Sequence, residues 1–283
     1  MKQPISAVFI ARNEEMVIGP SLDAVKEWVD EIILMDMQST DATAKIGRDK
    51  GAQVIETEMV WNFGIARTFG IRKAKNQWIL LLDADEIVSA GLAEEIKNAI
   101  NHDVADLLFL PRANFALSGF GPFESGFPEY QSRCFKKDCM RIDDYKGEVH
   151  LTYLPKEGIR IKKLVAAFPK TCLYHITNPT FEFLIDKINR YSTAEAMEQY
   201  SATYGFSRLR VILSGLKEFW VHYFVRKGYR DGWRGFWLSI VWFFYKVLIF
   251  GKCWEIKINK GNYPTVSNAR DQMLRYIADA LKK

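Results

Sequence analysis

Three acidic residues follow directly on an apolar run in the segment WILLLDADE, residues 78–86. They are Asp83, Asp85 and Glu86, and such crowding costs like-charge repulsion that a cation or a water-exposed turn would relieve. Because side chains alternate in an extended segment, Asp83 and Asp85 lie on the same side of the chain. Magnesium and manganese bind one or two carboxylates together with substrate phosphates. The segment therefore suggests a metal–diphosphate site, with a solvated turn as the alternative.

The elements around this segment alternate between strand and helix patterns. Ser89 is expected to cap a helix, and Gly51 to end one that starts near Ser39, Thr40 or Asp41. This alternation predicts an α/β fold with a mostly parallel central sheet and helices on both faces. The expected strands are 5–11, 31–36, 52–56, 78–83 and 106–110, and one expected helix is 63–74.

Polar side chains stand at the ends of several of these strands. In parallel sheets ligands bind at the carboxyl ends of the strands, so these residues are candidates for one shared site. The alternative is that strand ends are polar in any protein. The candidates are Arg12, Asn13 and Glu14 after the first strand, Asp36 after the second, and Asp83 and Asp85 after the fourth.

Composition sets the broad class of the protein. The chain has 283 residues, 48% of them hydrophobic and 26% charged, which is typical of a folded globular protein. Its net charge of +5 suits phosphate-bearing ligands or an anionic membrane surface, and we expect no nucleic-acid partner. The four cysteines are scattered without a CxxC pair, and the start of the chain does not resemble a signal peptide, so a cytoplasmic protein is expected.

Residues 111–177 are harder to interpret. The stretch PRANFALSGFGPFESGFPEYQ is dense in glycine, proline and aromatic residues and is expected to be a long loop. After it we expect a helix with Asn178 as N-cap and Pro179 at its first position. Strands are expected in QSRCFKK, GEVHLTYL and TCLYHIT.

The tail, from residue 217 to 257, is crowded with aromatic residues interleaved with Arg and Lys. Such a segment suits the membrane interface, whereas helices packed on the domain or an oligomer contact are the alternatives. A membrane-spanning helix is less favoured, because no uninterrupted apolar run has the length for one. We therefore expect a catalytic domain over 1–205 and a helical membrane-surface or oligomer-contact region over 206–283.

The first hundred residues resemble the inverting glycosyltransferases of family 2, which have the nucleotide-sugar-binding GT-A fold. One departure is Thr68, where the family usually has Asn. Segments beyond residue 110 resemble bacterial lipopolysaccharide-core glucosyltransferases, although His150 is followed by Leu151 where those proteins often have Glu. The segments that carry these resemblances are ISAVFIARNEE, DEIILMDMQSTDATAKI, FGIARTFGIRKAKNQWILLLDADE, FPEYQSRCFKK, GEVHLTY, KINRYSTAEA and RKGYRDGWRGFWLS.

The resemblance implies a role for each matching residue. Asn13, Glu14 and Asp36 would hold the uracil and ribose, with Arg12 beside them as a further substrate-binding candidate. Arg67 would lie near the phosphates of the nucleotide. Asp83 would contact the ribose or the sugar, and Asp85 would bind the divalent metal, Mg²⁺ or Mn²⁺.

Inversion needs a base that takes a proton from the attacking acceptor hydroxyl, and a carboxylate within hydrogen-bond reach would serve. Glu129 is the first choice, with an exposed loop acid as the alternative interpretation, and Glu148 is the second. His150 is equally a base, a metal ligand or a structural residue. Arg133 would pair with the base or with an acceptor phosphate. His175 could complete a metal shell, although a hydrogen-bonded core histidine is favoured.

The residues and the resemblance together predict a metal-dependent inverting glycosyltransferase of cell-envelope polysaccharide or lipopolysaccharide synthesis. It would move a hexose, with glucose as the first expectation, from a UDP-sugar to a glycan or glycolipid acceptor. We expect it to be peripheral on the inner face of the cell membrane, and a homo-oligomer is left open. An oxidoreductase would need a glycine-rich turn where ARNEE stands. A non-catalytic nucleotide-sugar-binding scaffold at the membrane is the remaining rival.

Overall fold

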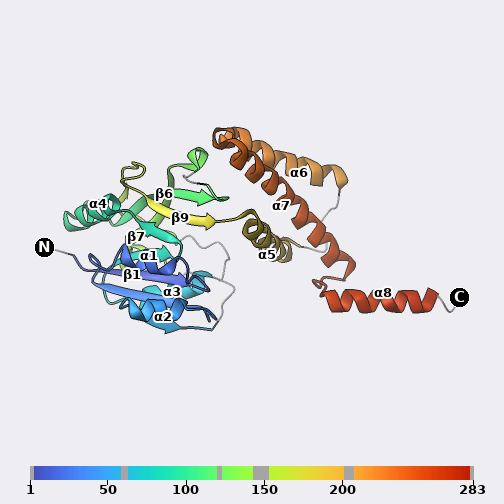
Figure 1. The fold of residues 1–283 in the computed structure, drawn as a ribbon, viewed down its shortest axis with the longest axis horizontal. Helices are drawn as coiled ribbons and strands as arrows, with labels where there is room; N and C mark the ends of the chain where they lie inside the picture. The colour runs from blue at the N-terminus through green and yellow to red at the C-terminus, as the bar shows by residue number, and fades with distance from the viewer. Residues whose placement is uncertain (1–2, 59–62, 120–122, 143–152, 201–206, 281–283) are drawn as a thin grey trace. The chain divides into compact units, whose positions relative to one another are not determined.

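The computed structural model describes residues 3–58, 63–119, 123–142, 153–200 and 207–280 (Figure 1). Within these the chain forms two compact units. The first contains most residues up to Thr177, and the second contains Asn178–Lys283 with the short segments 117–119 and 123–125. The sequence-based boundary at 205/206 therefore differs from the structural one, because helix α5 (Phe181–Gln199) belongs to the second unit.

Among the described residues, the first unit is built on a mixed sheet of nine strands. Its first half, in the order β3-β2-β1-β4, is parallel, as the alternating pattern predicted. β7 then pairs antiparallel with both β4 and β6. The strands are β1 Ile5–Ala11, β2 Glu31–Asp36, β3 Gln53–Glu56, β4 Trp78–Asp83, β5 Glu86–Val88, β6 Leu107–Ala116, β7 Glu129–Lys136, β8 Ile161–Lys163 and β9 Leu173–Asn178.

The sheet curls back on itself. Its path continues from β4 through β7, β6 and β9 and ends at β5, which pairs antiparallel with β9. Yet β5 follows β4 in the chain after only Ala84 and Asp85. The far end of the path must therefore return to the carboxyl end of β4, and this brings five strands to one place.

Helices cover both faces of this sheet. Alternate residues of the strands enter two separate cores, because successive side chains of a strand point to opposite faces. Phe9 and Leu80 lie in one core, whereas Val8 and Ile79 lie in the other with Ile71. The helices are α1 Ile18–Asp23, α2 Thr43–Asp49, α3 Phe63–Lys73 and α4 Ala90–Asn101.

Local signals predicted some element boundaries and missed others. The Ser89 side chain caps α4 by accepting from the Leu92 amide, and Gly51 after α2 has a φ of +83°, as expected. The helix α2 instead has Ala42 at its N-cap, with Asp41 accepting from the Thr43 amide.

Two further expectations about local structure were wrong. The cap of α5 is Thr180, whose hydroxyl accepts from the Phe183 amide, rather than Asn178. Asn178 is instead the last residue of β9, which leaves the first capping position two residues later. The expected loop from residue 111 is also wrong over its first part, because β6 continues through Pro111 to Ala116.

The second unit is helical. Helix α5 packs on α7 (Gly232–Ile258) through an apolar core that includes Leu184, Ile188, Val241 and Ile249. Helix α6 (Arg208–Trp220) lies against α7, and α8 (Val266–Ala280) follows. In the described residues one helix, over Gly228–Ile258, has the length and composition to cross a membrane, with a mean hydropathy of 1.5.

Candidate active site

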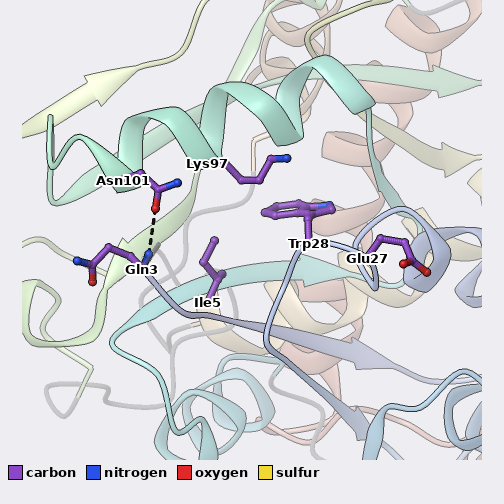
Figure 2. Close-up of a pocket in the computed structure, with 6 residues that line it drawn as sticks. All are labelled: Gln3, Ile5, Glu27, Trp28, Lys97 and Asn101. Carbon is purple, nitrogen blue, oxygen red and sulfur yellow. Dashed lines mark hydrogen bonds between the residues drawn. The ribbon is translucent and has the colours of Figure 1, made fainter. Parts of the chain in front are cut away.

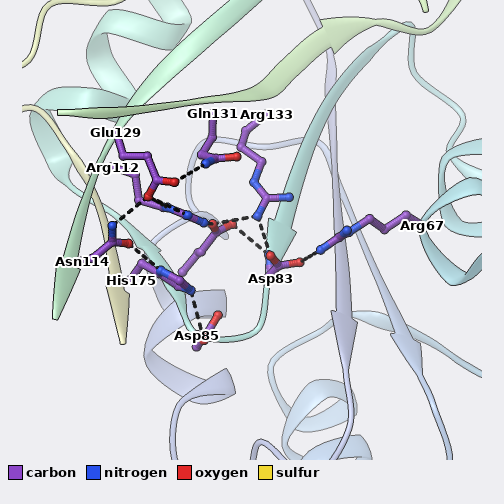
Figure 3. Close-up of polar contacts among 10 residues, drawn as sticks. Arg67, Asp83, Asp85, Arg112, Asn114, Glu129, Gln131, Arg133 and His175 are labelled. Carbon is purple, nitrogen blue, oxygen red and sulfur yellow. Dashed lines mark hydrogen bonds and ion pairs between the residues drawn. The ribbon is translucent and has the colours of Figure 1, made fainter. Parts of the chain in front are cut away.

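The polar network at the end of β4 begins with Asp83 (Figure 3). Arg67, on α3, donates to Oδ1 of Asp83 at 2.5 Å, and Arg133, on β7, donates to Oδ2. Burial alone would raise the pKa of Asp83, but the charges of Arg133 and Arg67 outweigh it and hold that pKa well below 3.8. Asp83 is therefore a permanent anion held between two guanidinium groups.

Glu86 is the buried centre of the network. Its carboxylate is 0% exposed and accepts from Arg112 at 2.9 Å and from Arg133 at 2.8 Å. Its second oxygen accepts from the Asp83 amide at 3.0 Å. A buried charge needs such pairing and hydrogen bonding to be tolerated. Glu86 thus acts as the anchor that orients both arginines and closes the turn after β4.

Glu129 lies on the other side of Arg112. Its Oε2 accepts from Arg112 at 2.8 Å and from Asn114 at 2.7 Å, while Oε1 accepts from Gln131 at 3.0 Å. Burial raises its pKa, but the charge of Arg112 and the hydrogen bonds outweigh that effect, so the pKa lies below 4.5. The side chain is 40% exposed, so an ionised carboxylate is presented to solvent. Glu129 is the first residue of β7, rather than part of a loop.

Asn114 and His175 form a chain of contacts that runs from Glu129 to Asp85. The Asn114 amide nitrogen donates to the carboxylate of Glu129, so its oxygen faces Nδ1 of His175 at 2.7 Å. Nδ1 must therefore carry a proton. The other ring nitrogen, Nε2, lies 3.4 Å from Oδ2 of Asp85. The ring is thus held by Asn114 on one side and faces the carboxylate of Asp85 on the other.

The residues of the network come from five different strands. Figure 3 shows them converging on one place, because the curled sheet returns β9 and β5 to the end of β4. The contributions are Asp83 from β4, Glu86 from β5, Arg112 and Asn114 from β6, Glu129, Gln131 and Arg133 from β7, and His175 from β9, with Arg67 added from α3.

The donor chemistry at Asp85 fits a divalent metal. The described residues contain no group of three or more His, Cys, Asp or Glu side chains that could hold a metal by itself. Asp85 and His175 still offer one oxygen and one nitrogen ligand, and their side chains are 23% and 13% exposed. Mg²⁺ and Mn²⁺ bind carboxylate oxygens such as those of Asp85 and take further ligands from water and phosphate, and a neutral imidazole is a common metal ligand in proteins. These two residues would hold the metal, with a diphosphate completing its shell.

The loops after β1 and β2 interlock. The Asn13 side chain accepts from the Thr40 amide at 2.8 Å, and Glu15 accepts from the Ala42 amide at 2.9 Å. Asn13 has a φ of 55°, and its own amide donates to Ser39 at 2.9 Å. The side-chain oxygen of Asn13, a predicted uracil or ribose contact, is therefore used to hold a loop.

Asp36 is a buried carboxylate with one oxygen that lacks a hydrogen-bond donor among the described residues. It is 2% exposed and Oδ2 accepts from the Ser39 amide at 3.1 Å, whereas Oδ1 has no partner among the described residues. A buried acceptor without a donor costs free energy, so it suits a site that a ligand fills. Arg12 and Glu14 lie on the same loop as Asn13, and Arg12 is exposed.

Sequence reasoning located part of this network. The structure brings together five of the predicted site residues, namely Asp83, Asp85, Arg67, Glu129 and Arg133. Glu148 and His150, the second candidate base and the second candidate metal ligand, lie outside the described residues. Arg112, Asn114 and the anchoring role of Glu86 were missed, since a stretch interpreted as a loop gave no signal that Arg112 and Asn114 share one face of a strand. The spacing of two residues between Arg112 and Asn114 suits one face of a strand, but that spacing does not by itself predict a strand.

Among the pockets in the described part of the first unit are two of similar volume. One of about 270 Å³ adjoins the network and is lined by Arg67, Leu81, Phe109, Tyr130, Gln131, Ser132, Arg133 and Tyr153. The other, also of about 270 Å³, contains no cluster of catalytic groups; the Gln3 amide donates across it to Asn101 (Figure 2). Its remaining lining is Ile5, Glu27, Trp28 and Lys97.

Comparison with known proteins gives relatives along nearly the whole chain. An uncharacterized glycosyltransferase of Rickettsia typhi is 26% identical over 97% of this chain and 94% of the relative. The lipopolysaccharide core biosynthesis glycosyltransferase LpsC of Rhizobium meliloti is 25% identical over 70% of this chain and 72% of its own length.

Solved structures are also similar. Staphylococcus aureus TarS, residues 1–349, is 14% identical, with a TM-score of 0.48 and 93% coverage of both chains. Glucosyl-3-phosphoglycerate synthase from Mycobacterium tuberculosis, in complex with Mn²⁺, UDP and glucosyl-3-phosphoglycerate, is 21% identical, with a TM-score of 0.35 and coverage of 40% of this chain and 44% of that one.

The decisive match is to a family model. The model described as glycosyl transferase family 2 matches residues 6–150, just over half of the chain. These residues contain the parallel half of the sheet and all the network except His175. The α/β fold with a mixed sheet and C-terminal helices is the one that the resemblance implied. The chain therefore belongs to glycosyl transferase family 2.

Proposed function

We propose that this family 2 glycosyltransferase is a metal-dependent inverting enzyme that moves a hexose from a UDP-sugar to a hydroxyl of a glycan or glycolipid. The observation that carries the proposal is that one network contains both the carboxylates suited to the donor and its metal and a carboxylate suited to act as the base. Asp83 ends β4 and Asp85 follows it, and the ionised, solvent-accessible Glu129 is linked to Asp85 through Asn114 and His175.

In the proposed reaction the acceptor oxygen attacks the anomeric carbon while the bond from that carbon to UDP breaks. Glu129 takes the proton of the attacking hydroxyl, a role that needs the ionised carboxylate found there. A bound divalent metal would neutralise the negative charge that develops on the departing diphosphate. Asp85 and His175 would hold that metal.

Binding of the nucleotide is assigned to the loops after β1 and β2. Oδ1 of Asp36 is a buried acceptor that a donor on the base or ribose would satisfy. Arg12, Asn13 and Glu14 border it, with Asn13 acting mainly by holding the Thr40 loop. Arg67 and Arg133 would face the phosphates or an acceptor anion while fixing Asp83.

The acceptor and the pathway are proposed from the similarity of this chain to a more distant relative. The relative LpsC is named for lipopolysaccharide core biosynthesis, and this supports a cell-envelope glycolipid as acceptor. With such a lipid-borne acceptor, we propose that the enzyme is peripheral on the inner face of the cell membrane. Glucose remains the first donor sugar to test.

The test is calorimetric binding of UDP by the full chain with Mn²⁺, with EDTA, and in Asp85→Ala. We expect metal-dependent binding that Asp85→Ala abolishes, while Asp49→Ala, a matched aspartate in an exposed ion pair, leaves it intact. Binding that ignores both metal and Asp85→Ala would refute the proposed donor site. Release of UDP from a panel of UDP-sugars, with and without an envelope glycolipid fraction, then separates an enzyme from a binding scaffold.

A further inference from the structure

We propose that α6 binds the surface of an anionic lipid bilayer and lies in the plane of that surface. The proposal deepens the proposed function, on which its purpose rests, by naming the residues that bring the enzyme to a lipid-borne acceptor. The contact itself requires neither donor nor metal. It can therefore be tested separately from catalysis.

Helix α6 displays an apolar stripe to solvent. Its members recur at spacings of three and four residues, which places them on one side of a helix. None of them is less than half exposed, and large apolar side chains gathered in this way mark interaction surfaces. The stripe consists of Leu209 (64% exposed), Ile212 (51%), Leu213 (54%), Leu216 (50%) and Trp220 (59%).

A different side of the same helix is already occupied. Gly215 is buried against α7, where a Cβ atom would come within 2.7 Å of the Phe243 ring. On a helical wheel Gly215 lies outside the arc that holds the stripe. Helix α6 is therefore held by α7 whether or not a partner is present, and the stripe is presented as a preformed surface.

Charge identifies the partner. Residues 207–283 contain 15 Lys and Arg against 5 Asp and Glu, a net +10, whereas the whole chain carries only +5. Arg208, Arg210 and Lys217 lie on α6 itself, beside the stripe. Apolar side chains flanked by basic ones suit an anionic lipid surface. A second copy of this region would instead bring one net charge of +10 against another, and the two would repel each other.

The length of α6 and the contacts of α7 favour a helix α6 that lies on the bilayer over a helix that crosses it. The 13 residues of α6 extend only about 20 Å, which is shorter than the hydrocarbon core of a bilayer. Helix α7 is longer, but its Lys252 ammonium is buried and donates to Ser192 and Thr193 of α5, each at 2.8 Å. The Tyr245 hydroxyl likewise donates to Glu195 at 2.5 Å. These contacts hold one side of α7 against α5, so α7 braces α6 from within the second unit.

The experiment is co-sedimentation of the full chain with vesicles, without donor or metal. One set contains phosphatidylcholine alone and the other contains phosphatidylcholine and phosphatidylglycerol in a three-to-one ratio. We expect binding to the anionic set, and at least a tenfold loss in Leu213→Gln/Leu216→Gln. The matched control is Met273→Gln/Leu274→Gln on α8, where the side chains are 64% and 62% exposed. It should bind as the unchanged protein does.

A second variant keeps the stripe and removes charge. Arg208→Gln/Lys217→Gln should weaken binding by about fivefold for each charge, and added salt should reproduce that loss. Unchanged binding in both α6 variants overturns the proposal, as does equal binding to neutral vesicles. A dimer in sedimentation velocity that Leu213→Gln/Leu216→Gln dissociates would assign the stripe to a second copy instead. Metal-dependent UDP binding, measured on the same samples, reports separately on the proposed function.

Discussion

The Nε2 atom of His175 lies 3.4 Å from Oδ2 of Asp85, and within the described part of the chain the ring is the polar partner of that side chain. Nδ1 of the same ring is held by Asn114. The ring is thus oriented from behind and presents one nitrogen to the carboxylate. Ligands fixed in this way support metal binding through their orientation.

His175→Ala should therefore raise the Mn²⁺ concentration needed for UDP binding by about tenfold to a hundredfold. The measurement is a calorimetric UDP titration at several Mn²⁺ concentrations. His102→Ala provides the control, because His102 is an exposed residue that bonds to the Asn98 carbonyl. An unchanged Mn²⁺ requirement in His175→Ala would remove His175 from the metal site.

Asp83→Asn should destabilise the first unit by about 3 kcal/mol, because it leaves Arg67 and Arg133 without their shared anion. The pKa of Asp83 is lowered by folding, so its stabilisation is present above its ordinary pKa of 3.8 and is lost as the pH falls below it. Denaturant unfolding between pH 3 and pH 7 should show a shallower acid loss in Asp83→Asn. Parallel curves for the two proteins would contradict this account.

The acid limb of the activity profile should depend on Arg112. If Glu129 is the base, activity requires its ionised form, and its lowered pKa places the acid limb of kcat/KM below pH 4.5. Arg112→Gln removes the main opposing charge, so burial then raises the pKa of Glu129 and the limb moves to higher pH. Arg160→Gln, at the distant Asp106 ion pair, should leave the limb in place. A limb that does not move in Arg112→Gln would exclude Glu129.

The position of Arg67 should depend on a glycine one turn further along α3. A Cβ atom at Gly70 would lie 2.6 Å from Val8 and 2.9 Å from Met35, so α3 would have to move away from the sheet. Gly70→Ala should cost about 1–3 kcal/mol in thermal or denaturant unfolding and weaken UDP binding. Gly251→Ala, in an open helical position, should be neutral or slightly stabilising. Equal stability of the two variants would show that α3 has room.

The acids of the site could be predicted from sequence because local rules placed them. A buried strand ending in Asp83 follows from its apolar run, and the strand-end rule places its acids at a shared edge of the sheet. Ser89 and Gly51 were identified for similar reasons, since capping and a positive φ depend on neighbouring residues alone. The role of Arg67, on α3, was instead implied by the resemblance to family 2.

The rest of the site depends on the long-range path of the sheet. Nothing near Arg112 shows that β7 inserts between β4 and β6, or that the sheet curls until Arg112 meets Glu86. Pro111 and the glycines that follow it favoured a loop, and antiparallel pairing with β7 overrode that preference. Which strands become neighbours is decided by tertiary packing, on which local composition carries no information.

The two residues between β4 and β5 limit how this chain can vary in length. Those strands lie four places apart along the sheet path, yet Ala84 and Asp85 alone connect them, and each carbonyl accepts a bond, from Ser21 and from the Ile176 amide. One inserted residue would shift β5 against β9 and turn Glu86 away from its arginines. Natural insertions and deletions should therefore be excluded from this connection, although the enzyme can accept them in its surface loops.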